Sequence, residues 1–377
     1  MNLGISEQEK LKQVESFAVS KVRKRASEID EGSTFPVDLI KEMGEIGVFS
    51  TYIPKEYGGL GLSLSTLMES IRIISRECAS TSLIPDVTVS LFGEPILKYG
   101  SEMLKKKYLS RIAKGTIGAL AITEPGTGSD AAGIKTRAIK KGDKYIINGE
   151  KTFITNGGEA QYFLASAVTF PEKKHHGITL FALDKDMSGL SIGKEFKKMG
   201  IRGTSTTEVL MDNVEVEEEQ MVGRLNEGFK IEMDTLNVGR IGIASQAIGI
   251  SEGAIRDIVN FGNEFKEINR EGVLFKLADM TNMLHSSVSK YYESIRQVEN
   301  GKDTTLLSSL SKLQAGDSAV KITSDAVEIL GHKAMSQEYP TERRFREAKI
   351  TQIYEGTNEI QRLIIAREIL KTGGPKF

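Results

Sequence analysis

Two short stretches of the sequence combine residue types that could bind a flat or charged group. In residues 121–130 (AITEPGTGSD), glycines would let the chain turn tightly and bring backbone N–H groups close to a ligand, while Thr123 and Ser129 supply hydroxyls. In residues 151–158 (KTFITNGG), Phe153 could stack on a ring, and a threonine two positions later could donate a hydrogen bond to it. The structural alternatives are a glycine-rich turn between strands and a strand end with its aromatic ring in the core.

A third stretch could supply a base. Residues 352–362 (QIYEGTNEIQR) follow an apparent loop and open the last predicted helix, with Thr357 or Asn358 as N-cap and Glu359 in the first turn. A carboxylate such as that of Glu355, on the loop before the helix, could have a raised pKa and take a proton from a substrate. An exposed loop acid is the structural alternative.

Hydrophobic spacing predicts the elements that must position these stretches. Residues 1–116 show apolar side chains at helical spacing, which predicts an N-terminal α-helical domain. Residues 117–224 contain short strand-like runs, with a turn expected at Asn148-Gly149, and predict a middle β domain, a barrel or a sandwich. Residues 225–377 return to helical spacing and predict a C-terminal four-helix bundle. The expected fold class is α+β.

The composition limits the function classes. The 377 residues include 50 Lys plus Arg and 51 Asp plus Glu, and the net charge of −1 argues against nucleic acid or an anionic membrane as main partner. The single cysteine, Cys78, excludes an intrachain disulfide, and the four histidines lack the spacing of a metal site. The first residues form no apolar run of the kind a signal peptide needs. We expect a cytoplasmic protein without a metal ion.

Taken together, the three stretches resemble motifs of the acyl-CoA dehydrogenase family, in the same order and at the same spacing. Residues 198–204 (KMGIRGT), 228–230 (GFK) and 239–244 (GRIGIA) match further motifs of that family. The resemblance covers essentially the whole chain, and the division into helical, β and helical parts is also the layout of the family. The chain is therefore identified as a divergent member that resembles the short- and medium-chain branch.

The resemblance implies a cofactor and a set of contact residues. Members of the family hold FAD between the β domain and the C-terminal bundle, with an acyl thioester beside the flavin. Flavin contacts fall on Leu120, Ile122, Thr123, Gly128, Ser129, Phe153, Ile154, Thr155, Thr357 and Glu359. Substrate contacts fall on Ser129, Asn237, Arg240 and Gly356. A tryptophan is common in the family where this chain has Phe153, so the stacking ring is kept and its N–H group is lost.

The resemblance also implies the reaction. Glu355 matches the catalytic base of the short- and medium-chain branches, whereas other branches place the base near residue 239, which here is Gly239. Glu355 would remove the α-proton of the thioester, its backbone N–H and a flavin hydroxyl would bind the carbonyl oxygen, and a hydride would pass from the β-carbon to the flavin. The family further implies a homodimer or homotetramer. The acyl group and the electron acceptor stay open.

Two segments depart from the family pattern where it contacts the adenosine diphosphate end of FAD. Residues 261–272 lack the usual Arg-x-x-Phe-Gly pattern, and residues 328–334 carry Glu328, His332 and Ala334 in place of a glutamine and two glycines. A carboxylate beside a pyrophosphate is repulsive by roughly 1 kcal/mol or more. We therefore expect FAD to bind more weakly than is usual for the family.

Three hypotheses follow from this pattern. The departures favour a biosynthetic enzyme that dehydrogenates an acyl group held by an acyl carrier protein, in a polyketide or nonribosomal type of pathway. An ordinary short-chain acyl-CoA dehydrogenase of fatty acid or amino acid catabolism is the alternative within the same class. The third hypothesis is a flavin-poor, catalytically weak subunit of a hetero-oligomer. The intact residues 354–357 (YEGT) argue against the third, since a silent subunit has no need of a base.

Overall fold

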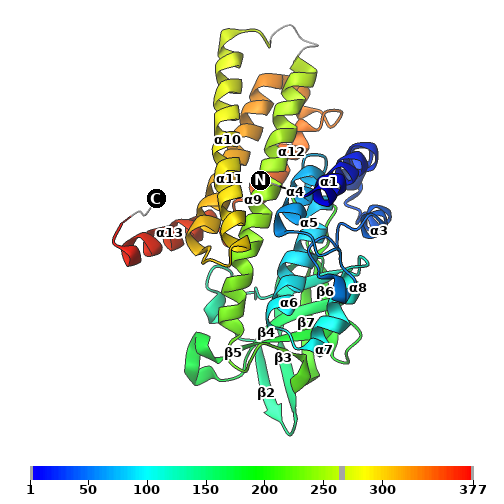
Figure 1. The fold of residues 1–377 in the computed structure, drawn as a ribbon, viewed down its shortest axis with the longest axis vertical. Helices are drawn as coiled ribbons and strands as arrows, with labels where there is room; N and C mark the ends of the chain where they lie inside the picture. Colours follow the sequence, from blue (N-terminus) through cyan, green and yellow to red (C-terminus); the bar gives the residue numbers. More distant parts are fainter. Residues whose placement is uncertain (1–2, 263–267, 375–377) are drawn as a thin grey trace.

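The computed structural model describes residues 3–262 and 268–374 of the chain. The helices that precede the first strand lie together on one side of the molecule (Figure 1). They are α1 (Ile5–Phe17), α2 (Arg23–Gly32), α3 (Val37–Glu45), α4 (Leu64–Ser75), α5 (Ala79–Asp86), α6 (Glu94–Tyr99), α7 (Glu102–Leu104) and α8 (Ser110–Ile112). Between α5 and α6 the helix continues as a π-helical segment, η3 (Val87–Gly93).

Part of this helical layer is fully buried. Ser63 caps α4 by accepting a hydrogen bond from the backbone N–H of Thr66, and the apolar face of α4 then packs against the long helix α9 (Gly228–Gly262). All residues of α5 and η3 are buried. Because η3 packs against the first strand on one side and α9 on the other, it lies between the sheet and the C-terminal helices.

The described residues contain eight strands, which form one sheet at the opposite end of the molecule from the tips of the long helices (Figure 1). They are β1 (Gly118–Ala121), β2 (Arg137–Lys141), β3 (Lys144–Thr155), β4 (Tyr162–Val168), β5 (Ile178–Asp184), β6 (Leu190–Glu195), β7 (Thr206–Glu217) and β8 (Met221–Val222). Neighbouring strands run in the order β6-β7-β3-β2-β4-β5-β8, and β1 pairs in parallel with β4. The ends of β1 and β3 lie beside the helices, because β1 packs against η3 and Nδ2 of Asn156, directly after β3, donates to the carbonyl of Ile84 on α5 at 3.3 Å.

Asn148 and Gly149 do not form the expected hairpin turn. They lie inside β3, which continues past them with a bulge against β7 between Ile147 and Gly149. The hairpin forms instead at Gly142, between β2 and β3, where φ is 64°. The side chain of Asn148 pairs with β7 because it donates to Oδ1 of Asn213 at 3.3 Å and accepts from the Asn213 backbone N–H at 2.8 Å. These bonds stabilise a strand where the dipeptide predicts a reversal.

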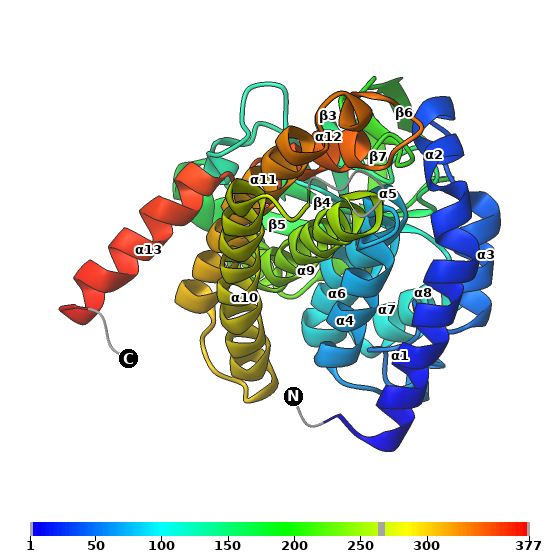
Figure 2. The same ribbon diagram turned by 90° about the horizontal axis from the view of Figure 1, so that it is seen from above.

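Long helices form the C-terminal part. Helices α9, α10 (Glu271–Glu299) and α11 (Thr305–Leu330) pack against one another, and α12 (Thr341–Ile350) packs on α11 and α9. The last helix, α13 (Asn358–Thr372), contacts α11 and then projects away from the other helices in both views (Figures 1 and 2). The helical, sheet and helical parts confirm the α+β fold expected from the sequence.

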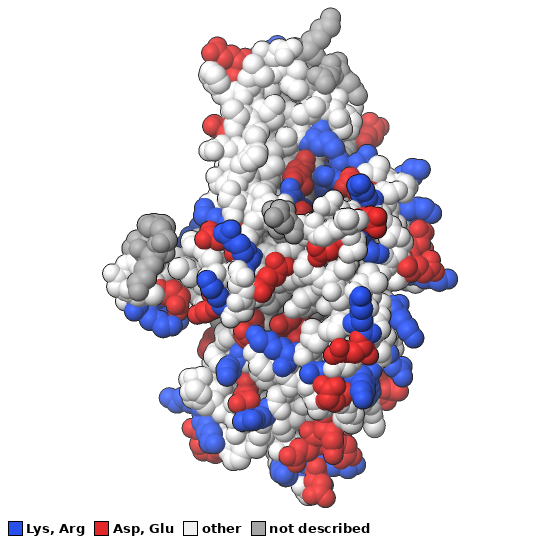
Figure 3. All heavy atoms as spheres, in the orientation of Figure 1, with Lys and Arg blue, Asp and Glu red and all other residues white. Residues whose placement is uncertain are grey.

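Charged side chains are unevenly distributed on the surface. On the face shown in Figure 3, positive and negative groups intermingle over the sheet and the N-terminal helices, whereas the upper part formed by α9 and α10 carries few charges. None of the helices in the described ranges is long and apolar enough to cross a membrane.

Candidate active site

Glu355 lies on the loop between α12 and α13, where the sequence places it, and its carboxylate is turned into the protein. Its backbone has a φ of 56°, and Gly356 follows with a φ of 85°. A side-chain-bearing residue adopts this left-handed conformation rarely and at some cost. The Oε2 atom is buried, and it has no hydrogen-bond partner among the described residues. Burial raises the pKa of Glu355 to about 7, while the positive charges of Arg240 and Lys312 act in the opposite direction.

Two side chains from neighbouring helices hold this strained turn. Lys312 on α11 donates from Nζ to the backbone carbonyl of Gly356 and to Oδ1 of Asn358, both at 2.8 Å. Gln361 on α13 donates to the same Gly356 carbonyl at 2.9 Å. Burial lowers the pKa of Lys312 to about 7, although the nearby Glu355 carboxylate opposes the shift. The position of Glu355 is therefore fixed by α11 and α13.

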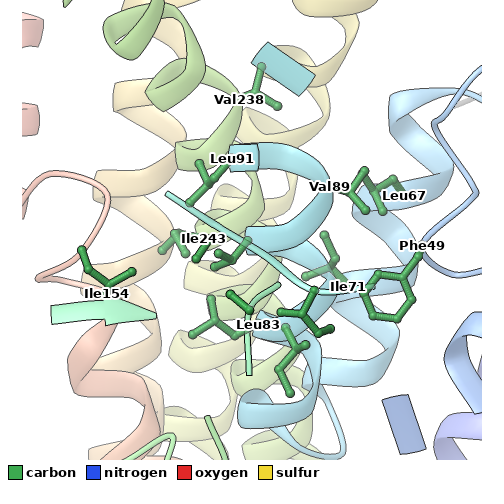
Figure 4. Packing of buried hydrophobic residues seen from close by; sticks show 14 of the residues in the cluster. Phe49, Leu67, Ile71, Leu83, Val89, Leu91, Ile154, Val238 and Ile243 are labelled. Carbon is green, nitrogen blue, oxygen red and sulfur yellow. The ribbon is translucent and has the colours of Figure 1, made fainter. Parts of the chain in front are cut away.

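The carboxylate of Glu355 lies over Gly239 on α9. A Cβ atom added at residue 239 would lie less than 3.0 Å from Oε2 of Glu355 and 2.6 Å from Cδ2 of Leu91 on η3. Real Cβ atoms essentially never approach so closely, so only glycine leaves room for the carboxylate here. Leu91 belongs to the buried hydrophobic cluster of Figure 4, which also includes Val238 from α9 and Ile154 from β3.

Arg240 and Asn237 form a pair on the same helix. Nη1 of Arg240 donates to Oδ1 of Asn237 at 2.7 Å, and Nδ2 of Asn237 donates to Oγ1 of Thr305 at 3.2 Å. Arg240 is buried, which lowers its pKa to about 10, and its Nε has no partner in the part of the chain that is described. The structure thus brings the charge of Arg240 to Glu355, and Asn237 orients the guanidinium from its other side.

The predicted flavin contacts on β1 and β3 lie side by side. Leu120, Ile122 and Thr123, at the end of β1, are all partly exposed. The backbone N–H of Thr152 on β3 donates to the carbonyl of Thr123 at 2.8 Å and joins the two segments. Thr155 closes β3 and is also partly exposed. Because β1 packs against η3, these strand ends lie next to the layer that carries Leu91.

Phe153 and Ile154 point in opposite directions from β3. Ile154 is buried in the core, whereas the side chain of Phe153 is 61% exposed and its backbone φ is 56°. The structural alternative that put the aromatic ring of this stretch in the core is therefore wrong. The ring of Phe153 packs against that of Phe196, with 4.6 Å between the ring centroids. An aromatic ring left open at a strand end offers a surface on which a flat group can stack.

Gly128 and Ser129 lie in the exposed turn that follows β1. A Cβ atom at Gly126 or Gly128 would meet nothing within 4 Å, so the turn borders open space. The hydroxyl of Thr127 in the same turn is buried, and no described residue is its hydrogen-bond partner. Within residues 3–262 and 268–374, no hydrogen bond links Gly128 or Ser129 to the Glu355 loop.

Thr357 and Glu359 occupy the start of α13. Oγ1 of Thr357 accepts from the backbone N–H of Ile360, which confirms Thr357 as one of the two expected N-caps. The pKa of the Glu359 carboxyl is lowered by a hydrogen bond from its own backbone N–H and by one from the Thr357 hydroxyl. Glu359 is exposed in the first turn of the helix.

Comparison with known proteins gives the family of this arrangement. Family models for the N-terminal, middle and C-terminal domains of acyl-CoA dehydrogenases match residues 6–116, 119–214 and 226–370. An acyl-CoA dehydrogenase of Bacillus subtilis is 41% identical over 365 residues, which cover 95% of this chain and 96% of the relative. The chain belongs to the acyl-CoA dehydrogenase family. It is thus a member of a family of flavin-dependent enzymes, as its sequence motifs predict.

Other similar proteins span both substrate carriers considered for this family member. The short-chain specific acyl-CoA dehydrogenase of Clostridium acetobutylicum is 40% identical, over 97% of this chain and 98% of the relative. The structure of butyryl-CoA dehydrogenase from Megasphaera elsdenii has a TM-score of 0.96 and 36% identity, and it covers 98% of this chain and 99% of that one. The prolyl acyl carrier protein oxidase AnaB has a TM-score of 0.92 and 29% identity, over 97% and 99% of the two chains.

Sequence motifs miss two residues that help to position the Glu355 carboxylate in this acyl-CoA dehydrogenase family member. Lys312 and Leu91 lie far from Glu355 in sequence, and the fold brings them to it. Lys312 does leave a signal, because it is the only charged residue in residues 304–316, a run of small and apolar side chains. An unaccompanied charge in a buried helix needs a partner, and here the partners are on the Glu355 turn.

The two segments that depart from the acyl-CoA dehydrogenase pattern differ in what the structure describes. Residues 263–267, in the first segment, lie outside the described residues. In the second segment, Glu328 on α11 is exposed and forms an ion pair with Lys276 on α10, which holds the pKa of its carboxyl below the usual value. A cation therefore accompanies the carboxylate expected to repel a pyrophosphate.

Proposed function

We propose that this chain dehydrogenates a short acyl-CoA thioester between its α- and β-carbons, with Glu355 as the base. The observation that carries the proposal is the buried Oε2 atom of Glu355, which has no hydrogen-bond partner among the described residues and is held over Gly239 by a turn of unfavourable backbone conformation. With a pKa of about 7, a large fraction of this carboxylate is ionised near neutral pH, and it is more basic than an ordinary glutamate.

The backbone beside the base supports a role in binding the thioester carbonyl. The N–H groups of Glu355 and Gly356 donate no backbone hydrogen bond to any described residue. A free N–H group next to the base can donate to the oxygen on which negative charge develops when the α-proton leaves. Arg240 and Lys312 add positive charge nearby and keep the carboxylate available in its ionised form.

The strand ends fit a flat cofactor. The exposed ring of Phe153 offers a stacking surface, and the space over Gly126 and Gly128 offers room. The hydroxyl of Thr127, which has no partner in the described part of the chain, offers a polar contact. The residues that would hold FAD are Leu120, Ile122, Thr123, Gly128, Ser129, Phe153, Ile154, Thr155, Thr357 and Glu359, and Ser129, Asn237, Arg240 and Gly356 would contact the acyl thioester. When bound, FAD supplies the acceptor for the hydride of the β-carbon.

The comparisons support CoA over a carrier protein as the thioester partner. Identity is 40% to the short-chain specific acyl-CoA dehydrogenase and 29% to the carrier protein oxidase, over nearly the same share of this chain. A carrier-bound acyl group is the second candidate, favoured by the replaced residues in 328–334, because a phosphopantetheine arm needs no CoA nucleotide site. The chemistry at Glu355 is the same for both.

A homo-oligomer is part of the proposal. On α10, Leu274 and Phe275 are exposed, and on α13, Leu363 and Leu370 are exposed on a helix that projects from the molecule (Figure 2). The few charges on the α9 and α10 surface are consistent with burial against a second copy (Figure 3). Light scattering after size-exclusion chromatography should give the mass of a dimer or tetramer, and a 41.4 kDa species would refute this part.

The experiment that tests the function compares wild type with Glu355→Gln. With added FAD, butyryl-CoA and an artificial electron acceptor, the substitution should lower kcat by about 100- to 10,000-fold, the usual contribution of a general base. Flavin occupancy should stay unchanged, and Glu338→Gln, at an exposed glutamate, should behave as wild type. Wild-type turnover by Glu355→Gln would refute the base assignment.

The same assay separates the three hypotheses. Turnover of butyryl-CoA supports the acyl-CoA dehydrogenase proposal. Turnover of a butyryl group on an acyl carrier protein, but not of butyryl-CoA, would move the assignment to the second candidate. Failure of the wild-type protein with both substrates at saturating FAD would leave the weak subunit of a hetero-oligomer.

A further inference from the structure

Asp86, the last residue of α5, is a buried carboxylate that the mechanism does not use. Its side chain is 1% exposed, and Oδ1 has no hydrogen-bond partner among the residues described. Oγ of Ser90, one helical turn later, is buried as well, and its hydroxyl lies near enough to the Asp86 carboxyl to lower the pKa of that group. Leaving a carboxyl oxygen unpaired in the protein interior is unfavourable, so Oδ1 of Asp86 marks a place where a bound group could complete the hydrogen bonding.

The carboxyl of Asp86 shares one face of α9 with the base. A Cβ atom added at Gly242 would lie less than 3.0 Å from Oδ1 of Asp86 and 2.6 Å from its Oδ2. Gly239, which faces Glu355 in the same way, is three residues earlier on the helix. Positions three apart lie on the same helix face with Cβ atoms about 5–6 Å apart. The two carboxyls therefore lie within about 10 Å of each other over this glycine face.

The surroundings define which group could meet Asp86. Leu91 on η3 lies against Gly239, so the space beside the base is bounded by an apolar side chain. Burial raises the pKa of Asp86 to about 8, the Ser90 hydroxyl opposes this shift, and the charge of the nearby Glu355 adds to it. At neutral pH the Asp86 carboxyl is mostly protonated and can still accept a hydrogen bond, whereas a negative group at this place would be repelled by the nearby Glu355 carboxylate. A purely apolar group would leave Oδ1 unpaired.

We propose that Asp86 selects acyl groups that carry a hydroxyl or amino group beyond the β-carbon, by accepting a hydrogen bond from it at Oδ1. This inference rests on the proposed function, because the acyl chain must pass Glu355 with its α-carbon and continue along the glycine face of α9. Asp86 is then a specificity residue at the far end of the acyl site. The buried, unpaired oxygen of Asp86 destabilises the free enzyme, and a hydrogen bond from the matching substrate would offset that destabilisation.

The test compares 4-hydroxybutyryl-CoA with pentanoyl-CoA, which differ only in a terminal hydroxyl in place of a methyl group. For the wild-type holoenzyme, kcat/KM should favour the hydroxyl substrate by roughly 10-fold or more, since a buried acceptor left unpaired discriminates by that order. Asp86→Val should reverse the preference, and Asp86→Asn, which keeps an acceptor oxygen, should retain it. Glu232→Gln is the matched control, because Glu232 is a buried α9 carboxylate with both oxygens unpaired within the described chain.

The outcomes separate this inference from the proposed function. An enzyme that turns over both thioesters with equal kcat/KM, or whose preference is unchanged in Asp86→Val, overturns the role of Asp86 and leaves the dehydrogenase proposal intact. A change of preference in Glu232→Gln of the same size as in Asp86→Val also overturns it. An inactive wild type with butyryl-CoA refutes the proposed function and the inference together. If Asp86→Val does not fold, the ratio of the two wild-type kcat/KM values still tests the role of Asp86.

Discussion

Gly239→Ala is the substitution that tests the geometry of the base most directly. The added Cβ would lie about 1 Å inside the 3.4 Å at which ordinary van der Waals contact with Oε2 of Glu355 begins, and Leu91 blocks the space beside it. The carboxylate must therefore retreat by about 1 Å, and a displacement of that size can lower turnover by about 100-fold. In a helix interior, alanine is favoured over glycine by about 1 kcal/mol, so the loss should not come from lower helix stability.

The assay is the steady-state rate with butyryl-CoA at pH 8, where the base is mostly ionised, together with flavin content and thermal midpoint. Gly272→Ala on α10 is the control, since its Cβ would meet nothing within 4 Å. If the clash with Glu355 is the cause, combining Gly239→Ala with the shorter Glu355→Asp should cost less than the product of the two single losses. A folded, flavin-loaded Gly239→Ala enzyme with wild-type kcat would refute the placement of the carboxylate.

Three further predictions concern the groups around the site. Lys312→Met should lower kcat and move the midpoint of the pH–rate profile upward from about 7, because the charge of Lys312 lowers the pKa of Glu355 in wild type. A profile with an unchanged midpoint would contradict this prediction. Wild type should lose stability relative to Asp86→Asn as the pH rises from about 4 to 8, because Asp86 stays protonated in the folded protein and ionises in the unfolded one. In urea unfolding, the difference in the free energy of unfolding should reach at most about 4 kcal/mol near pH 7. Parallel curves of unfolding free energy against pH for the two proteins would contradict this prediction. Glu328→Gln should tighten FAD binding by roughly 5-fold in a fluorescence titration. Weak binding by wild type would be refuted if the wild-type protein retained stoichiometric flavin after dialysis.

The order of the helical, sheet and helical parts could be predicted from the sequence, because it depends only on the spacing of apolar residues along the chain. Helical spacing before and after a strand-rich middle is visible in residues 1–116 and 225–377 without knowledge of contacts. The error at Asn148-Gly149 has a different origin, since a dipeptide that favours a turn can also occupy a bulge when its side chain finds a partner. That partner, Asn213, is 65 residues away, so local sequence could not reveal it.

The residues of the candidate site likewise fall into those that local sequence identifies and those that only the fold brings together. The local strings contain Glu355, its turn and the strand-end residues, and motif spacing is enough to single them out. Lys312, Leu91 and Asp86 come from separate helices, and only tertiary packing brings them to the base. Asp86 resembles Lys312 in its sequence signal, because it is the only charged residue in residues 79–93. Isolated charges within long neutral helices therefore point to the groups that motif matching misses.

In this chain, the pairing of Gly239 with Glu355 leaves room for a base at only one of the two positions that the family resemblance suggests, residue 355 and not residue 239. The Glu355 carboxylate fills the space that any side chain at residue 239 would need, since even a Cβ there would collide with Oε2. A glutamate on α9 would reach the same space from the helix, but it would require residue 355 to withdraw. The left-handed backbone of Glu355, the lysine that holds its turn and the glycine beneath it are thus one arrangement. Its parts should be altered together, and altering one alone should misplace the base.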